Sequence, residues 1–384
     1  MNGPPCRLTL TLSALLTATP LPAQTTRAPE LISISAADLP TLRIIPRATA
    51  PESVIGGTGV RSFAVSPAGV IVVDNGERHL RVIAPDGSLL RTIGRAGEGP
   101  GEFAGPLQLG WLHDTLVVVD PGLARVTLFR AITGDLLATV PTVPPLSAWV
   151  TVTLADRLYG ISPTWTGGMR ETPSMPGRRA RALMSTVIPI TARGPAPRIP
   201  LLRDSLINGD GFDCEHPDGS VDVTAFFPDH GPLVTVLPGP RLVTATRDSF
   251  LLTVRAPGTA TPIALIRDPG PRQRVTDRLW DAVTAPWRDA GGRLRCGAEL
   301  PRPAFVPVVR ALQGDGQGRL WVEVSTPGGT EVRVLEGTGS GIGRFPMPGH
   351  VIDVPWQVRD GILYLVVADA DGLQEIRSYR VGVG

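Results

Sequence analysis

The five histidines are the first residues to weigh for metal or proton chemistry. They are His79, His113, His216, His230 and His350. A zinc site takes its ligands at close spacings or from several converging elements. No two of these histidines have a close ligand spacing. We therefore interpret each as an isolated surface or turn residue, with convergence through the fold as the alternative.

Carboxylates are densest in residues 210–219, where Asp210, Asp213, Glu215 and Asp218 stand among two glycines. A calcium-binding loop alternates its oxygen ligands at fixed positions around a glycine. The spacing here does not follow that rule, and we interpret the segment as a solvated turn. The sequence thus predicts no metal and no cofactor.

Two cysteines remain once an export signal is set aside. Residues 1–23 carry one charged side chain, Arg7, before the apolar run Leu8–Leu16, and this predicts a signal peptide. A disordered tail is the alternative. Cys214 and Cys296 are then an even pair in an oxidising periplasmic or extracellular setting, which predicts one disulfide, with two free thiols as the alternative.

The charge pattern argues against several classes of partner. The net charge is +2, lysine does not occur, and the arginines are dispersed apart from Arg178–Arg181. Nucleic-acid binding needs a concentrated basic stripe, so we expect no nucleic-acid partner.

No run beyond the signal approaches the roughly 18–20 apolar residues of a membrane helix. No G-x-S-x-G elbow, P-loop or Cys-x-x-Cys occurs. No motif therefore supports α/β-hydrolase, NTPase or thioredoxin chemistry.

The elements that must position any site are short strands. The 44 glycines and 40 prolines are spread between Val-, Ile- and Leu-rich runs, a pattern typical of all-β folds. Val70–Ile93 aligns with Thr115–Val140, so that Asp74 falls on Asp120, 46 positions later. Each copy holds three strand-like runs and follows a fourth, which is the pattern of a propeller blade. Asp74 and Asp120 are predicted to cap the turns after second strands.

Weaker copies extend this rhythm to the end of the chain. Their expected strands are Trp149–Thr153, Arg157–Ile161 and Leu183–Ile190, then Leu233–Leu237, Leu242–Thr246, Phe250–Arg255 and Ile263–Ile266, then Val308–Leu312, Arg319–Val324, Glu331–Leu335 and Ile342–Phe345, and finally Val351–Val354, Ile362–Ala368 and Gln374–Val381. The last copy is one strand short, and Thr41–Ile45 is predicted to supply it. We predict an all-β, six-bladed β-propeller of four-stranded antiparallel blades, closed by that N-terminal strand.

One connection carries a family resemblance. Arg95–Phe103 (RAGEGPGEF) resembles the G-x-G-x-G-x-F connection of NHL-type repeats, and the chain as a whole resembles exported bacterial six-bladed β-propellers related to NHL repeats. The resemblance implies the fold and export but no single activity. Calcium-dependent propellers similar to gluconolactonase hold their ion with several asparagines. This sequence has three, Asn2, Asn75 and Asn208, of which the first lies in the signal. The count argues against a calcium lactonase of this kind, with a site made of carboxylates alone as the alternative.

Three additions interrupt the expected blades, at Pro163–Arg181, Leu201–His230 and Asp268–Ala304. In a four-stranded antiparallel blade, the connection between strands two and three and the exit to the next blade share one face. The additions should therefore gather there, with Cys214 and Cys296 joining the second to the third. Val275, Leu279, Val283 and Trp287 recur at helical spacing in the third addition. This one short helix is either a lid or, as we favour, packing filler.

The predicted organisation is a signal peptide at 1–23, a flexible N-terminus at 24–40 and one propeller domain at 41–384. We expect a monomeric binding scaffold whose partner, a protein or a small molecule, meets the face that bears the additions. Arg78, His79, Arg95 and Glu98 are the candidate binding residues, because they lie in connections assigned to that face. The alternative is a lactonase, hydrolase or lyase with an axial site that the sequence does not identify.

Overall fold

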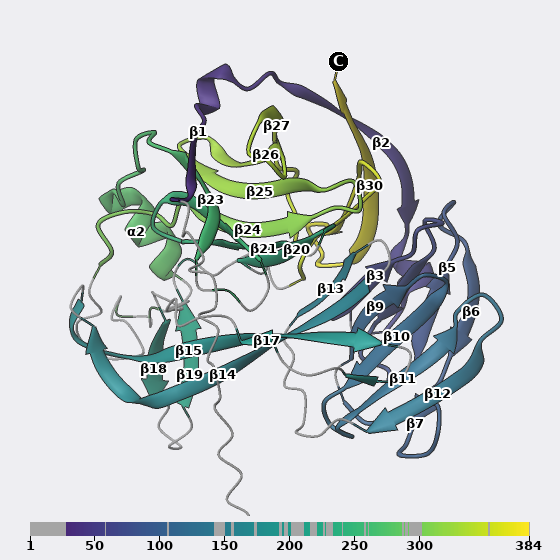
Figure 1. Ribbon diagram of the computed structural model, residues 1–384. Coiled ribbons are helices and arrows are strands. Elements are labelled where there is room, and N and C mark those ends of the chain that lie inside the picture. Colours follow the sequence, from purple (N-terminus) through teal and green to yellow (C-terminus); the bar gives the residue numbers. More distant parts are fainter. Residues whose placement is uncertain are drawn as a thin grey trace, which may run out of the picture.

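The structure, a computed structural model, describes residues 28–57, 59–105, 107–141, 150–154, 157–172, 175–191, 194–195, 199–200, 211–215, 221–225, 227, 233–239, 241–256, 259, 261–285, 288, 291, 302–351 and 354–383. Between 150 and 225 this description covers the backbone alone. The described chain is mostly β-strand, with two short α-helices and one short 3-10 helix (Figure 1).

The two strong sequence copies form two four-stranded antiparallel sheets. The first contains β3 (Ser62–Val65), β4 (Ile71–Asp74), β5 (Leu80–Ile83) and β6 (Leu89–Ile93). The second contains β9 (Gln108–Leu112), β10 (Thr115–Asp120), β11 (Arg125–Arg130) and β12 (Asp135–Pro141). In each sheet the second strand is apolar on both faces because neighbouring sheets cover both.

The third sheet departs from its prediction. It holds β13 (Val150–Leu154), β14 (Arg157–Thr172) and β15 (Met175–Thr191), and both β16 (Gly194–Pro195) and β17 (Ile199–Pro200) pair with β15. We expected an addition at Pro163–Arg181 interrupting this sheet. Its backbone instead continues β14 and β15 as one long antiparallel hairpin. The second addition contains a smaller hairpin of β18 (Gly211–Glu215) and β19 (Val221–Ala225).

The fourth and fifth sheets match the predicted strands closely. The fourth is formed by β20 (Val234–Leu237), β21 (Arg241–Ala245), β22 (Phe250–Arg255) and β23 (Pro262–Asp268), and β1 (Glu30–Ser33) adds a parallel fifth strand. The fifth is formed by β24 (Val309–Gly314), β25 (Arg319–Thr326), β26 (Gly329–Glu336) and β27 (Gly341–Pro346).

The last sheet confirms the pairing expected of the N-terminal strand. It is ordered β2 (Leu42–Ala50), β30 (Gln374–Val383), β29 (Ile362–Ala368) and β28 (Gln357–Arg359), with β2 antiparallel to β30. Its first strand was expected at Val351–Val354, and that prediction was wrong. The two-residue turn Asp360–Gly361, with φ of 50° and 75°, pairs Arg359 with Ile362 and fixes β28 next to it.

The first strands of successive sheets contact one another in sequence order. β3 contacts β9, β9 contacts β13, β13 contacts β20, β20 contacts β24, β24 contacts β28, and β28 contacts β3. Apolar side chains fill the spaces between neighbouring sheets, as Val72, Trp111 and Leu116 do between the first two. The arrangement is propeller-like. No helix within the described residues is long and apolar enough to cross a membrane.

Residues 28–40 of the N-terminal segment contain two short elements. Residues 24–40 were predicted to be flexible, yet within them β1 pairs with β23 and a 3-10 helix forms at Ala36–Asp38. In Figure 1 the segment runs from β1 beside β23, arches past β26 and β27, and continues into β2 beside β30. No turn or period in the sequence signals this edge strand, because its partner lies more than 200 positions away.

Candidate functional site

Three connections meet on the predicted face at the seam between the last and first sheets. They are α1 (Glu52–Ile55) with the glycines that follow it, the turn between β4 and β5, and the turn between β29 and β30. Gly57 has a φ of 72°, and a Cβ there would lie 2.7 Å from the carbonyl oxygen of Asn75. Glycine is therefore needed for the α1 connection to lie against the β4–β5 turn.

The Glu77 carboxylate gathers the polar groups of this turn. Its Oε2 accepts a hydrogen bond from Asn75 Nδ2 at 2.9 Å and lies 3.1 Å from His79 Nε2 and 3.5 Å from Arg81 Nη2. Asn75 Nδ2 also donates to the carbonyl of Ile55, and Arg81 Nη1 donates to that of Val54. The cluster thereby fastens α1 to the first sheet.

A shallow pocket of about 150 Å³ lies beside this cluster. Its lining residues are Glu52, Ile55, Gly56, Gly57, Gly59, Gly372, Leu373 and Gln374. Gln374 Oε1 accepts the N–H of Val60 at 2.7 Å, so the amide is held in place at the pocket wall. Leu373 is 52% exposed at the rim. One carboxylate, one amide and two apolar side chains can hold a partner group but do not form an acid–base pair.

The predicted binding residues fall into two separate places. Arg78 is exposed at the tip of the β4–β5 turn with a φ of 57°, and His79 beside it pairs with Glu77. Arg95 instead donates through Nε to Glu102 Oε1 at 2.7 Å. The carbonyl of Glu98 accepts from Arg125 Nη1 at 2.8 Å. The recorded contacts therefore hold each pair within its own connection rather than bringing the four together.

The connection containing Arg95 and Glu98 is a compact loop. Its ends, β7 (Arg95–Ala96) and β8 (Glu102–Phe103), pair in parallel. Glu102 Oε2 accepts the N–H of Gly99 at 2.8 Å, and Arg125 donates to the carbonyls of Glu98, Gly99 and Glu102. The Gly99 hydrogen bond and then Arg95 hold the pKa of Glu102 below its ordinary value. The glycines serve the fold of this loop.

The recurring aspartates have the structural role that the repeat predicted. Asp74 Oδ1 accepts the N–H of Gly76, and its Oδ2 accepts that of Leu107 in the next connection, both at 2.9 Å. Asp120 likewise accepts from Leu123 and Ala104, at 3.2 and 2.9 Å. Burial raises the pKa of Asp74, and its two backbone hydrogen bonds oppose that shift.

The third addition contains the predicted helix, α2 (Asp277–Thr284), whose Thr276 side chain accepts the N–H of Leu279. Leu279, Val283 and Trp280 pack against a buried cluster of Phe227, Val275 and Val306. This packing favours the filler interpretation over a lid.

Several candidates fall where the structure gives no side chains. The backbone of Cys214 lies in β18, whereas Cys296, His216 and His230 lie outside the described residues. Among the described histidines, His113 sits in the β9–β10 turn with a φ of 56°, and His350 Nδ1 lies 3.3 Å from the carbonyl of Pro348. Across the described part of the chain, no three His, Cys, Asp or Glu side chains group to hold a metal.

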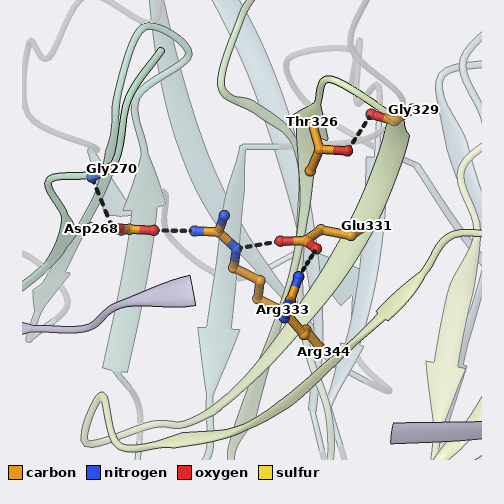
Figure 2. A network of polar contacts seen from close by, with 7 residues as sticks. All are labelled: Asp268, Gly270, Thr326, Gly329, Glu331, Arg333 and Arg344. Carbon is orange, nitrogen blue, oxygen red and sulfur yellow. Dashed lines mark hydrogen bonds and ion pairs between the residues drawn. The ribbon is translucent and has the colours of Figure 1, made fainter. Parts of the chain in front are cut away.

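An ion-pair network, which the sequence analysis did not predict, joins the fourth and fifth sheets (Figure 2). Arg333 donates to Asp268 Oδ2 at 2.6 Å and to Glu331 Oε1 at 2.9 Å, and Arg344 donates to Glu331 Oε2 at 3.0 Å. The Arg333 and Asp268 side chains are only 10% and 8% exposed. Asp268 lies on the fourth sheet and Arg333 on the fifth, so their pairing has no local pattern in the sequence. The only local sign is that Glu331 and Arg333 are two positions apart and share one face of a strand.

Comparisons with known proteins give similarity of arrangement only. No family model matches the sequence, and no curated protein matches it. A protein described as exported, from Bacteroides fragilis, is 10% identical over 92% of this chain and 99% of its own, with a TM-score of 0.43. The WD40 repeats of RRP9 are 10% identical over 90% and 99%, with a TM-score of 0.43.

A gluconolactonase from Xanthomonas campestris is 14% identical, with 89% of this chain and 99% of that chain covered and a TM-score of 0.40. Similarity at this level assigns neither a family nor an activity. The fold and the site together define an all-β protein with a propeller-like arrangement of sheets and a polar seam between its last and first sheets.

Proposed function

We propose that this chain is an exported six-bladed β-propeller that binds a protein partner through the face carrying its strand two–three connections. The cyclic contacts of β3, β9, β13, β20, β24 and β28 support six blades in a closed ring, and the pairing of β2 with β30 supports closure by the N-terminal strand. The predicted signal at 1–23 supports export.

The size of the seam pocket is the observation that favours a protein over a small molecule. Pockets that enclose a small ligand usually measure about 300–1,000 Å³. The seam pocket, at about 150 Å³, takes a single side chain. Exposed Leu373 at its rim and the exposed Arg78 turn nearby would contact the rest of a partner's surface.

The surface chemistry at this seam fits one protruding partner side chain. Gln374 offers an amide, Glu52 a carboxylate, and Leu373 an apolar edge. We expect an inserted polar or basic side chain, with apolar contact around it. Buried contacts at the centre of an interface dominate its affinity, so Leu373 and Gln374 should matter most.

The test is capture of a partner from an envelope extract by wild-type and variant protein. Leu373→Asp and Gln374→Ala should each reduce retention at least about tenfold, because each removes contact energy at the interface centre. Leu137→Asp is the matched control, since Leu137 is 45% exposed on the outer strand β12. Equal loss in the control, or retention by both seam variants, would overturn the proposed surface.

Metal analysis of the purified, untagged protein tests the enzyme alternative. A tightly held, stoichiometric calcium or zinc ion would contradict a pure scaffold and favour a hydrolase, lactonase or lyase. The scaffold proposal predicts that no such ion copurifies.

A further inference from the structure

Three glycines at alternate positions make a track along β27 and the turn before it. They are Gly339, Gly341 and Gly343. A Cβ built at each of the three would meet a side chain of the N-terminal segment, so the missing side chains leave a depression for that segment. A Cβ at Gly339 would lie 3.0 Å from Ile32 Cδ1, and one at Gly343 would lie 2.6 Å from Leu42 Cδ2. A Cβ at Gly341 would clash with Leu39.

The N-terminal segment fills this depression with side chains of its own. Leu39 and Leu42 are 7% and 5% exposed. Ile32 packs against the core between the fourth and fifth sheets, and Leu42 belongs to the core between the fifth and last sheets. A segment with mostly exposed strand residues is therefore anchored at three apolar points.

Backbone hydrogen bonds fix the same segment at both sides of the track. β1 pairs in parallel with β23, and the N–H of Ile34 donates to the carbonyl of Arg267 at 2.9 Å. The N–H of Arg344 donates to the carbonyl of Pro40 at 2.8 Å. The segment thus spans from the fourth sheet across the fifth before β2 joins the last, along the path visible in Figure 1.

The docking surface and the segment that docks on it thus belong to the same chain. We infer that the outer edge of β23 and the glycine track of β27 form a strand-accepting groove, and that residues 30–42 dock in it as a clasp that opens separately from the sheets. The groove recognises an extended apolar segment whose bulky side chains meet the glycines. Strand addition at a sheet edge is a general way for proteins to bind extended peptides.

Hydrogen exchange on the full chain tests separate opening. Gly341→Leu fills the groove, and overpacking of this kind should raise the amide exchange of residues 30–42 by about tenfold to hundredfold. Exchange in β3–β6 should stay unchanged. The control is Gly328→Leu, because a Cβ at Gly328 meets nothing within 4 Å. Leu39→Ala, which adds no bulk to the groove, should raise exchange in the same segment.

Peptide binding tests the groove itself. A labelled peptide of residues 28–42 should bind the full-length Ile32→Asp/Leu39→Asp variant, whose own clasp is weakened while the glycines remain. The peptide should not bind Gly341→Leu. If the peptide also fails to bind the Ile32→Asp/Leu39→Asp variant, the inference is wrong. Exchange of residues 30–42 that rises only together with exchange of the sheets would overturn it too.

Discussion

The carboxylate of Asp74 accepts the backbone N–H of Leu107, 33 positions further along the chain, at 2.9 Å. Asp74 ends the second strand of one sheet, and Leu107 lies just before the first strand of the next. Asp120, which ends the second strand of the next sheet, accepts the N–H of Ala104 in the same connection. Two buried carboxylates, one from each sheet, therefore hold the connection between the first and second sheets.

Replacing Asp74 should weaken this junction. Asp74→Ala leaves the N–H groups of Gly76 and Leu107 without their acceptor, so we expect the free energy of unfolding to fall by about 1–3 kcal/mol. Chemical denaturation measures it. Asp135→Ala is the control, because Asp135 is exposed and accepts only from Thr133 among the recorded contacts. Equal loss of stability in the two variants would contradict the junction role.

Glu102 should make the 95–103 loop sensitive to acid. Its folded-state pKa lies below the ordinary value, because the Gly99 N–H and Arg95 favour the carboxylate. Its stabilising contribution is therefore fully present above the unfolded-state pKa and is lost as the pH falls through the folded-state pKa. Amide exchange at Gly99, compared at each pH with an unstructured reference, should show protection fall at acidic pH. In Glu102→Gln that pH dependence should disappear; its persistence would assign the effect to another group.

The Asp268–Arg333–Glu331 network should respond unequally to single and combined changes. Arg333→Met leaves two nearly buried carboxylates facing each other, so we expect a loss of about 3–5 kcal/mol. Removing both carboxylates as well, with Asp268→Asn and Glu331→Gln, should recover much of it. Arg344→Met should cost less, because that side chain is 38% exposed. Thermal denaturation measures these losses. If the loss of stability in the triple variant equals the sum of the losses in the single variants, the three side chains are not coupled.

The helix cap at Thr276 offers a local test of α2. Its side chain accepts the N–H of Leu279 at 3.3 Å, and Thr276→Ala should weaken the helix by about 0.5–2 kcal/mol. Faster amide exchange confined to residues 277–284 would be the expected result. Thr259→Ala is the control, since its hydroxyl donates to a turn carbonyl away from any helix. Unchanged exchange in α2 would argue that packing alone sustains it.

The predicted Cys214–Cys296 disulfide is open to a direct test. Peptide mapping of the exported protein without reduction should recover one cross-linked peptide pair. We expect loss of the bridge in Cys214→Ser to lower the unfolding temperature, because the bridge restricts the unfolded chain. Recovery of both thiols as free cysteines would show that the bridge is absent.

Local patterns in the sequence predicted most of the strands and the turn aspartates, and the missing strand of the last copy predicted the long-range pairing of β2 with β30. Other long-range contacts were not predicted. The repeat placed Asp74 and Asp120 correctly because each acts within or next to its own sheet. Ile32 and Gly339 carry no sign in the sequence that they meet. The long β14–β15 hairpin was taken for an insertion because glycines and prolines punctuate its middle, whereas pairing across the hairpin overrides that local preference.

The sequence predicted the face on which the candidate site lies but not the residues that line its pocket. Arg78 and His79 lie there, but the groups that line the pocket, Glu52 and Gln374, come from opposite ends of the chain. No spacing rule connects residues so far apart, because their proximity depends on the pairing of β2 with β30.

That pairing also sets an order of events during synthesis. Ala48 and Ser378 exchange hydrogen bonds across 330 positions of chain. β2 is therefore synthesised long before β30 and lacks that partner while the 330 positions between Ala48 and Ser378 are made. Contacts of such long range slow folding.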